Sequence, residues 1–171
     1  MRMLPRLALA ALMVLAACRD SGTGDHFALD GKLFVFNYRV ATATYLVNLK
    51  QLRPLGEGHV AVASFEDPAG GAPILVREKI WPQATRTTIH SPPVHCIVKD
   101  RPYAVTIRIE DPAGNPVQQI DTTVTSSQDQ SVLPDKPLVV GPLYDPNPGN
   151  VEAVGPKPTS CPPQRKDSAI R

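Results

Sequence analysis

The most constraining feature of this sequence is a strict alternation between Tyr103 and Glu110. Every second residue from Tyr103 to Ile109 is apolar or aromatic, and the residues between them are Ala, Thr and Arg. Successive side chains of a strand point to opposite faces of a sheet, so this pattern predicts a half-buried antiparallel strand. Six further segments have strand character: Lys32–Tyr38, Ala43–Lys50, His59–Glu66, Ile74–Trp81, Thr85–His90 and Val117–Thr125. We therefore expect an all-β fold, a single antiparallel β-sandwich of about seven strands over residues 28–142, immunoglobulin-like or similar.

A five-residue motif recurs between these segments. Glu66-Asp67-Pro68-Ala69-Gly70 is repeated 44 residues later as Glu110-Asp111-Pro112-Ala113-Gly114. Asp, Pro and Gly in this order are typical of tight turns, so each copy predicts a hairpin: 59–66 with 74–81, and 103–110 with 117–125. The four acids could instead ligate calcium, but neither loop has the dense ligand spacing of such sites.

The chain begins with a positively charged and then apolar segment. Arg2 and Arg6 precede the run Leu7–Ala17, which is 11 residues long. This is about half of the roughly 20 residues that a membrane-spanning helix needs, so a secretory signal is favoured. Leu15-Ala16-Ala17-Cys18 resembles the lipobox of bacterial lipoproteins. The resemblance implies a diacylglyceryl group on the Cys18 thiol and cleavage between Ala17 and Cys18.

We accordingly expect a signal peptide at 1–17 and a lipid anchor with a tether at 18–27. The covalent lipid is the only cofactor expected, and membrane lipid is the first partner. In enterobacteria an Asp directly after the lipidated Cys favours the inner membrane. Here Arg19 occupies that place and Asp20 follows it, so the rule favours the periplasmic side of the outer membrane.

Cleavage would also change the net charge. Removing Arg2 and Arg6 lowers Lys+Arg from 18 to 16, against 16 acidic residues, so the formal charge falls from +2 to 0. A neutral mature chain has no overall attraction to nucleic acid.

The C-terminal region differs in composition from the rest. Asp145 to Arg171 contains six prolines and no aromatic residue, which predicts a disordered tail over 143–171. Cys96 and Cys161 remain after Cys18 is assigned to lipid, and an oxidising compartment allows them to form a disulfide. Free thiols, or a bridge to another chain, are the alternatives.

Candidate chemistry elsewhere is sparse. His90, His95 and Cys96 lie within seven residues and could form a soft-metal cluster, but they lack the paired spacing of zinc sites, so we expect no metal. The sequence contains no Gly-x-Ser-x-Gly elbow and no phosphate-binding loop. We therefore expect a protein that is not an enzyme.

The strand pattern from about residue 58 to 124 resembles a family of small lipoproteins. His59–Phe65, Ala72–Val76 and Arg101–Ile109 are similar to strands of the family typed by YbaY and by the YscW secretion chaperones, or pilotins. The resemblance implies a small β-sandwich at the outer membrane. In the pilotin members it implies binding of a secretin subunit and its escort to that membrane.

These observations favour a non-catalytic binding or assembly module for an envelope protein. We expect the partner to add a strand at an exposed sheet edge, or to bind in a groove between the sheets. The candidate edge contains Trp81, Thr85 and Thr87. The alternatives are a structural lipoprotein that links membrane and cell wall through the tail, and a ligand-binding or inhibitor lipoprotein with an apolar pocket.

Overall fold

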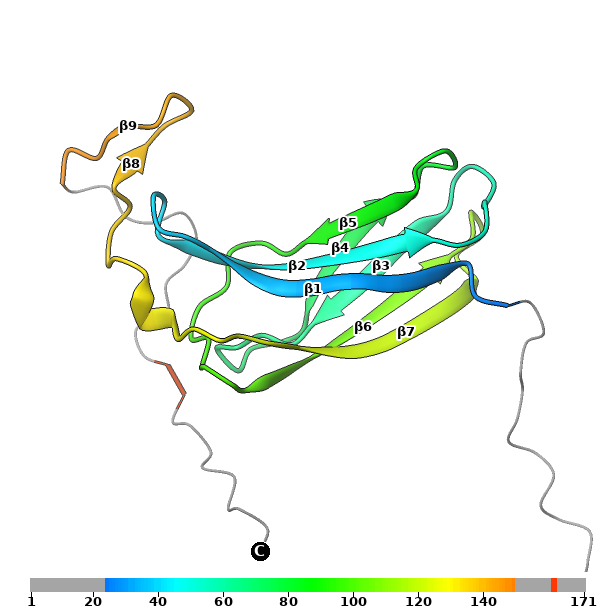
Figure 1. The fold of residues 1–171 in the computed structure, drawn as a ribbon, viewed down its shortest axis with the longest axis horizontal. Helices are drawn as coiled ribbons and strands as arrows, with labels where there is room; N and C mark the ends of the chain where they lie inside the picture. Colours follow the sequence, from blue (N-terminus) through cyan, green and yellow to red (C-terminus); the bar gives the residue numbers. More distant parts are fainter. Residues whose placement is uncertain (1–23, 150–160, 163–171) are drawn as a thin grey trace, which may run out of the picture.

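The computed structural model describes residues 24–149 and 161–162 and shows a β-sandwich (Figure 1). The predicted signal peptide, Cys18 and most of the tether lie outside these residues. One sheet has the order β1-β2-β5, with β1 (Phe27–Asn37), β2 (Thr42–Gln51) and β5 (Arg86–His90). The other has the order β4-β3-β6-β7, with β4 (Ile74–Lys79), β3 (Val60–Phe65), β6 (Pro102–Glu110) and β7 (Pro116–Thr125). All neighbouring strands are antiparallel, which confirms the predicted fold class.

The connections follow a Greek-key path. β1 with β2, β3 with β4, and β6 with β7 form hairpins within one sheet, and the two hairpins predicted from the repeated turn motif are among them. The connections β2 to β3, β4 to β5 and β5 to β6 cross from one sheet to the other. Such crossings are characteristic of immunoglobulin-like sandwiches.

The core lies between the two sheets and follows the predicted alternation. Every second residue of β6 from Tyr103 to Ile109 is buried, and so are the inward residues of β2. Tyr45 lies at the centre of an aromatic cluster, with ring centroids 4.3 Å from Phe34 and 4.9 Å from Phe65. Large rings packed in this way leave the interior of the sandwich filled with side chains.

The two ends of the sandwich carry different parts of the chain (Figure 1). The described chain enters at the end that also holds three loops: 52–59, 81–85 and 111–115. We call this the N-terminal end. The opposite end holds four other segments: 38–41, 66–73, 91–101 and 126–149. The first described residue, Gly24, and the segment that holds Cys96 therefore lie at opposite ends of the domain.

The segment after β7 folds against the opposite end. It contains the 3₁₀ turn η1 (Gln130–Val132) and a small hairpin of β8 (Val139–Val140) and β9 (Asp145–Pro146). The backbone N–H groups of Leu138 and Val139 both donate to the carbonyl of Arg39, which holds the hairpin against the β1–β2 turn. β9 lies within residues 143–171, for which the composition predicts a disordered tail, so this part of the tail prediction is corrected. Most of that tail, from residue 150, is outside the described residues.

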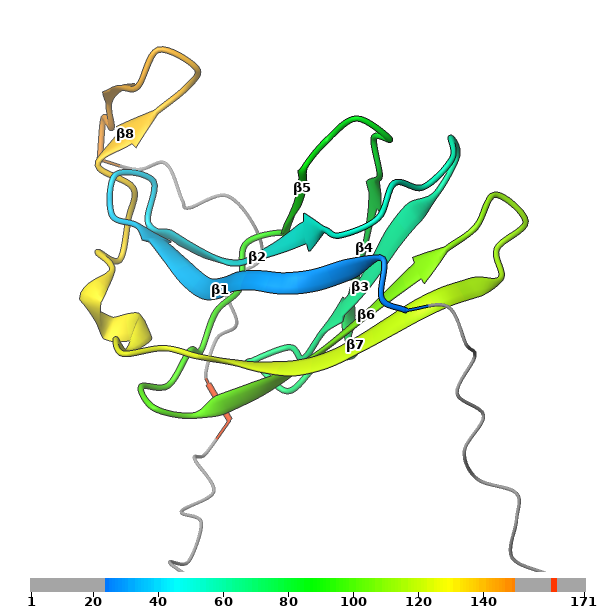
Figure 2. The same ribbon diagram turned by 45° about the vertical axis from the view of Figure 1, so that its right-hand side comes forward.

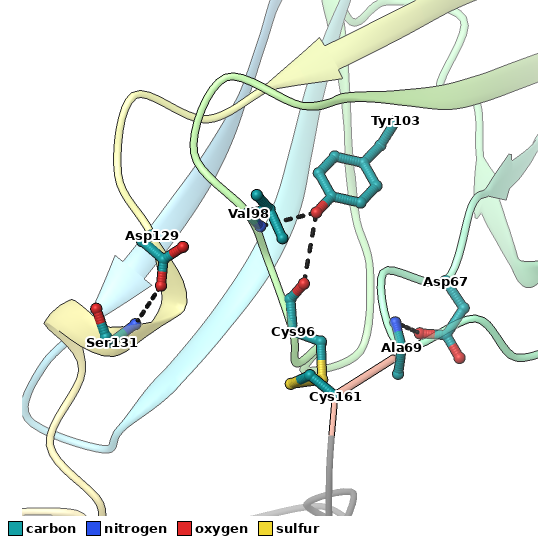
Figure 3. The surroundings of a disulfide bond; sticks show 8 residues. All are labelled: Asp67, Ala69, Cys96, Val98, Tyr103, Asp129, Ser131 and Cys161. Atoms are coloured by element: carbon teal, nitrogen blue, oxygen red, sulfur yellow. Dashed lines mark hydrogen bonds between the residues drawn. A yellow bond between two sulfur atoms is a disulfide. The ribbon is translucent and has the colours of Figure 1, made fainter. Parts of the chain in front are cut away.

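A disulfide between Cys96 and Cys161 joins the C-terminal region to the β5–β6 connection (Figure 3). The two Cα atoms are 5.4 Å apart, within the usual range for a disulfide. A closed loop of this length contributes about 4 kcal/mol to folding in the chain-entropy account. Of the alternatives left open by the sequence, the structure contains the intrachain bridge.

Candidate functional site

The sandwich has two long sides, and on one of them the sheet edges are bridged by side chains. The edge strands β1 and β7 meet there, where the Gln118 side chain takes the place of a neighbouring strand. Its Oε1 accepts from the N–H groups of His26 and Phe27 at 2.8 and 2.9 Å, and its Nε2 donates to the Phe27 carbonyl at 2.7 Å. Lys32 Nζ donates to Thr122 Oγ1 further along. The outward backbone groups of β1 are thus partly satisfied within the domain.

On the other side the edges belong to β4 and β5 (Figure 2). Among the residues that the structure describes, no strand pairs with the outer edge of either. In β5, register and hydrogen bonds fix the direction of each backbone group. Gln51 N–H donates to the Thr85 carbonyl, and Ser91 N–H donates to the Tyr45 carbonyl. The backbone groups of every second residue from Thr85 therefore point toward β2. The free edge groups of β5 are those of Arg86, Thr88 and His90.

This register corrects the predicted edge residues. Thr85 and Thr87 direct their backbone groups to β2, and Thr87 is only 6% exposed. In a β-strand the backbone N–H and C=O groups of one residue point to the same side. A residue that bonds β2 therefore cannot also bond an incoming strand on the outer edge. Trp81 is exposed but lies at the N-terminal end, beyond the last residue of β4. Thr85 and Thr87 thus belong to the segment that ends the three-stranded sheet, and the backbone groups free on its outer side are those of the alternate residues.

The inner face of β4 is incompletely covered, because three strands face four. Ile74, Val76 and Glu78 point inward, yet all three are only half-buried. The inward residues of the neighbouring strands β3 and β6 are buried. β4 approaches β5 at its edge. A further strand paired to β5 would extend the three-stranded sheet over Ile74 and Val76.

The outer face of β4 carries a row of exposed side chains: Leu75, Arg77, Lys79 and Trp81. Lys79 Nζ lies 3.8 Å from the centroid of the Trp81 ring, a cation–π contact. Arg77 donates to the buried carboxylate of Glu110 at 3.1 Å, and Arg108 donates to the other oxygen at 3.3 Å. These ion pairs join side chains of β4 and β6 on the outer face of the sheet. They do not involve the backbone groups at the outer edge of β4.

A shallow hollow of about 180 Å³ lies at the N-terminal end, between residues 51–54 and 82–85. Leu52, Pro54 and Pro82 contribute its apolar surface. Pockets for small ligands usually measure about 300–1,000 Å³ and enclose most of the ligand. This hollow has the character of a surface depression.

The other candidate chemistries are accounted for by local structure. Cys96 is oxidised in the disulfide and offers no thiolate to a metal. Within residues 24–149 and 161–162, no three His, Cys, Asp or Glu side chains are grouped as metal ligands. Asp67 and Asp111 lie at opposite ends, and each carboxylate accepts N–H groups of its own turn. Hydrogen bonds, first of all from the Asn115 side chain, lower the pKa of Asp111. The repeated motif therefore makes turns.

Two buried tyrosines are structural. The Tyr103 hydroxyl accepts from Val98 N–H at 2.8 Å and donates to the Cys96 carbonyl at 3.4 Å, which holds the disulfide-bearing segment against β6 (Figure 3). A tyrosine that binds the preceding crossover is a feature of immunoglobulin-like sandwiches. The Tyr45 hydroxyl donates to the Glu66 carbonyl at 2.8 Å. Burial raises the pKa of both Tyr45 and Tyr103.

In the described part of the chain, no helix is long and apolar enough to cross a membrane. Comparison with known proteins found no protein-family model that matches this chain and no curated protein that is similar to it in sequence.

Proposed function

We propose that this chain is a non-catalytic, lipid-anchored binding or assembly module for an envelope protein, on the periplasmic side of the outer membrane. The lipobox-like residues ending at Cys18 support the anchor. The pilotin resemblance supports an outer-membrane assembly protein, such as a secretin subunit, as the partner.

One observation carries the binding role: the β4/β5 side combines a free sheet edge with half-buried apolar residues beneath it. A partner segment in extended form would pair with the outward groups of Arg86, Thr88 and His90. Every second side chain of that segment would cover Ile74 and Val76. We therefore propose strand addition to β5 by a segment with alternating apolar residues.

The test uses a photoreactive phenylalanine analogue in place of Thr88, in full-length protein expressed in its native membranes. A matched control carries the analogue in place of Gln119, which is also exposed but lies on β7. We expect a crosslink to an envelope protein from position 88 and none from position 119. Equal crosslinking from both positions, or none from either, would contradict strand addition.

The anchor is tested in the same cells by palmitate labelling and membrane fractionation. Cys18→Ser should abolish the label, release the protein from the membrane and remove the crosslink from position 88. A Cys18→Ser protein that remains labelled and membrane-bound would exclude the lipid anchor.

A second function, a structural link between membrane and wall, is favoured by one observation. Cys161 is fixed at the end of the domain opposite the entry of the chain at Gly24. Removing residues 163–171, beyond the disulfide, should then reduce association with isolated cell wall while thermal unfolding is unchanged. Unaltered wall association would exclude this function.

A further inference from the structure

Two exposed apolar side chains lie at the N-terminal end of the sandwich. Leu52 is 51% exposed and lines the shallow hollow between residues 51–54 and 82–85. Trp81 is 57% exposed and directly precedes Pro82, which also lines the hollow. Tryptophan is enriched where proteins meet the headgroup region of a bilayer, since its ring is apolar and its N–H is polar. Exposed apolar residues also occur elsewhere on the domain, so exposure alone does not identify a membrane contact.

The position of the tether distinguishes this end from the rest of the surface. Leu52 N–H donates to the His26 carbonyl at 2.8 Å, and Arg53 Nη1 donates to the Gly24 carbonyl at 3.0 Å. The loop after β2 is thus bonded to the first described residues of the chain. Five residues separate Cys18 from Gly24. Even a fully extended chain of this length spans only about 20 Å. A lipid on Cys18 would keep this end close to the bilayer.

The charges at this end match a zwitterionic surface. Lys79 lies over the Trp81 ring, and Arg53 follows Leu52, so each apolar side chain has a cation beside it. Glu57 and Asp111 lie in neighbouring loops of the same end. With both signs present, apolar contact contributes more than net attraction to anionic lipid.

We propose that the N-terminal end of the sandwich rests on the bilayer surface through Leu52 and Trp81, with Arg53 and Lys79 at the level of the phosphates. The proposal rests on the lipid anchor at Cys18. It gives the domain a fixed orientation, in which the end bearing Cys161 points away from the membrane. In this orientation Trp81 contacts the membrane and not the partner strand.

The experiment uses the fact that Trp81 is the single tryptophan of the chain. The chain starting at Cys18 is coupled through that thiol to a maleimide phospholipid in phosphatidylcholine vesicles that contain brominated acyl chains. With Cys96 and Cys161 in the disulfide, Cys18 is the thiol left for coupling. Because this anchor is attached chemically, the result does not depend on whether the cell lipidates Cys18.

The matched control moves the tryptophan to the other end of β4. Trp81→Phe combined with Leu75→Trp places the indole six residues away, about 20 Å along the strand, at a site that is already 68% exposed. We expect the bromines to quench Trp81 at least twice as strongly as the control tryptophan, with a blue shift of its emission. Leu52→Ser should reduce the quenching of Trp81, and added salt should leave it unchanged.

Equal quenching of the two tryptophans, or emission of Trp81 unchanged from that of the uncoupled protein, would overturn the proposal. Circular dichroism of each variant shows that the sandwich is folded. Loss of palmitate labelling in cells would refute the natural anchor alone, whereas the vesicle result decides the contact itself.

Discussion

On the side where β1 meets β7, inward polar side chains form hydrogen bonds between the two sheets. On the side where β4 meets β5, the inward side chains of β4 are mainly apolar and only half-buried. β7 and β4 are the two edge strands of the same four-stranded sheet, which packs on the three-stranded sheet. Gln118 bonds the backbone groups of His26 and Phe27 at the start of β1, whereas the apolar side chains of Ile74 and Val76 form no hydrogen bond toward β5. The comparison indicates that a sandwich with unequal sheets can bridge one side with its own side chains while the described strands leave the edges on the other side unpaired.

The largest expected effect tests which backbone groups of β5 are free. Thr87→Pro removes an N–H that faces β2 and leaves a buried carbonyl without its donor, so we expect a loss of about 3 kcal/mol in the free energy of unfolding. Thr88→Pro removes an outward N–H and should cost less than about 1 kcal/mol. Urea denaturation measures both, with Thr87→Ala to account for the side chain. Similar losses from the two prolines would show that β5 is not a free edge.

The next effect concerns the bridged side. Gln118→Ala leaves two N–H groups and the carbonyl at the start of β1 without their partner, and we expect a loss of about 2–3 kcal/mol. Gln119→Ala serves as the control, since the exposed Gln119 amide donates to the Asp121 side chain and not to the backbone of β1. Urea denaturation should show a change below about 0.5 kcal/mol for this control. If the two alanine variants are equally stable, Gln118 does not close this side.

A smaller effect separates the two faces of β4. Val76→Ala removes inward methyl groups that pack against the core, and should lower the free energy of unfolding by about 1 kcal/mol. Leu75→Ala changes the outer face and should have almost no effect, although the side chain is larger. Thermal unfolding of both variants measures the difference. In the photocrosslinking assay Val76→Ala should also weaken capture of the partner; unaltered capture would argue against contact with the inner face of β4.

The smallest effect is the coupling between Lys32 and Thr122 across the bridged side. Their side chains are exposed, so a double-mutant cycle with Lys32→Met and Thr122→Val should give a coupling energy of about 0.5 kcal/mol or less. The coupling should fall further in high salt, because the donor is charged. A coupling above about 1 kcal/mol would show that this exposed pair adds substantially to the bridge made by Gln118.

Local pattern was sufficient to predict much of this fold. The alternation from Tyr103 to Ile109 identified the buried face of β6, and the turn chemistry of Asp67 and Asp111 identified two hairpins. Each of these signals is contained within a few residues. They do not determine which sheet a strand joins, because that depends on contacts between residues far apart in the chain.

The details of the candidate site were not predictable for the same reason. Gln118 lies in a strand with no motif around it, and its partners are more than 90 residues earlier. The inward direction of Thr87 follows from its register with Leu49 in β2. Alternation within Thr85–His90 is weak, since three of the residues are threonines, so either face could have been the buried one.

The disulfide has a consequence for how the domain would respond to force. If the chain is held at the membrane by its first residues and pulled from beyond Cys161, tension enters the sandwich covalently at Cys96. The 64 residues between the two cysteines then bear no force, so pulling does not unravel β6 and β7. Only the segment from Gly24 to Cys96 would lengthen. Reduction of the bond would add about 230 Å of contour length, so the bridge sets the mechanical reach of the protein.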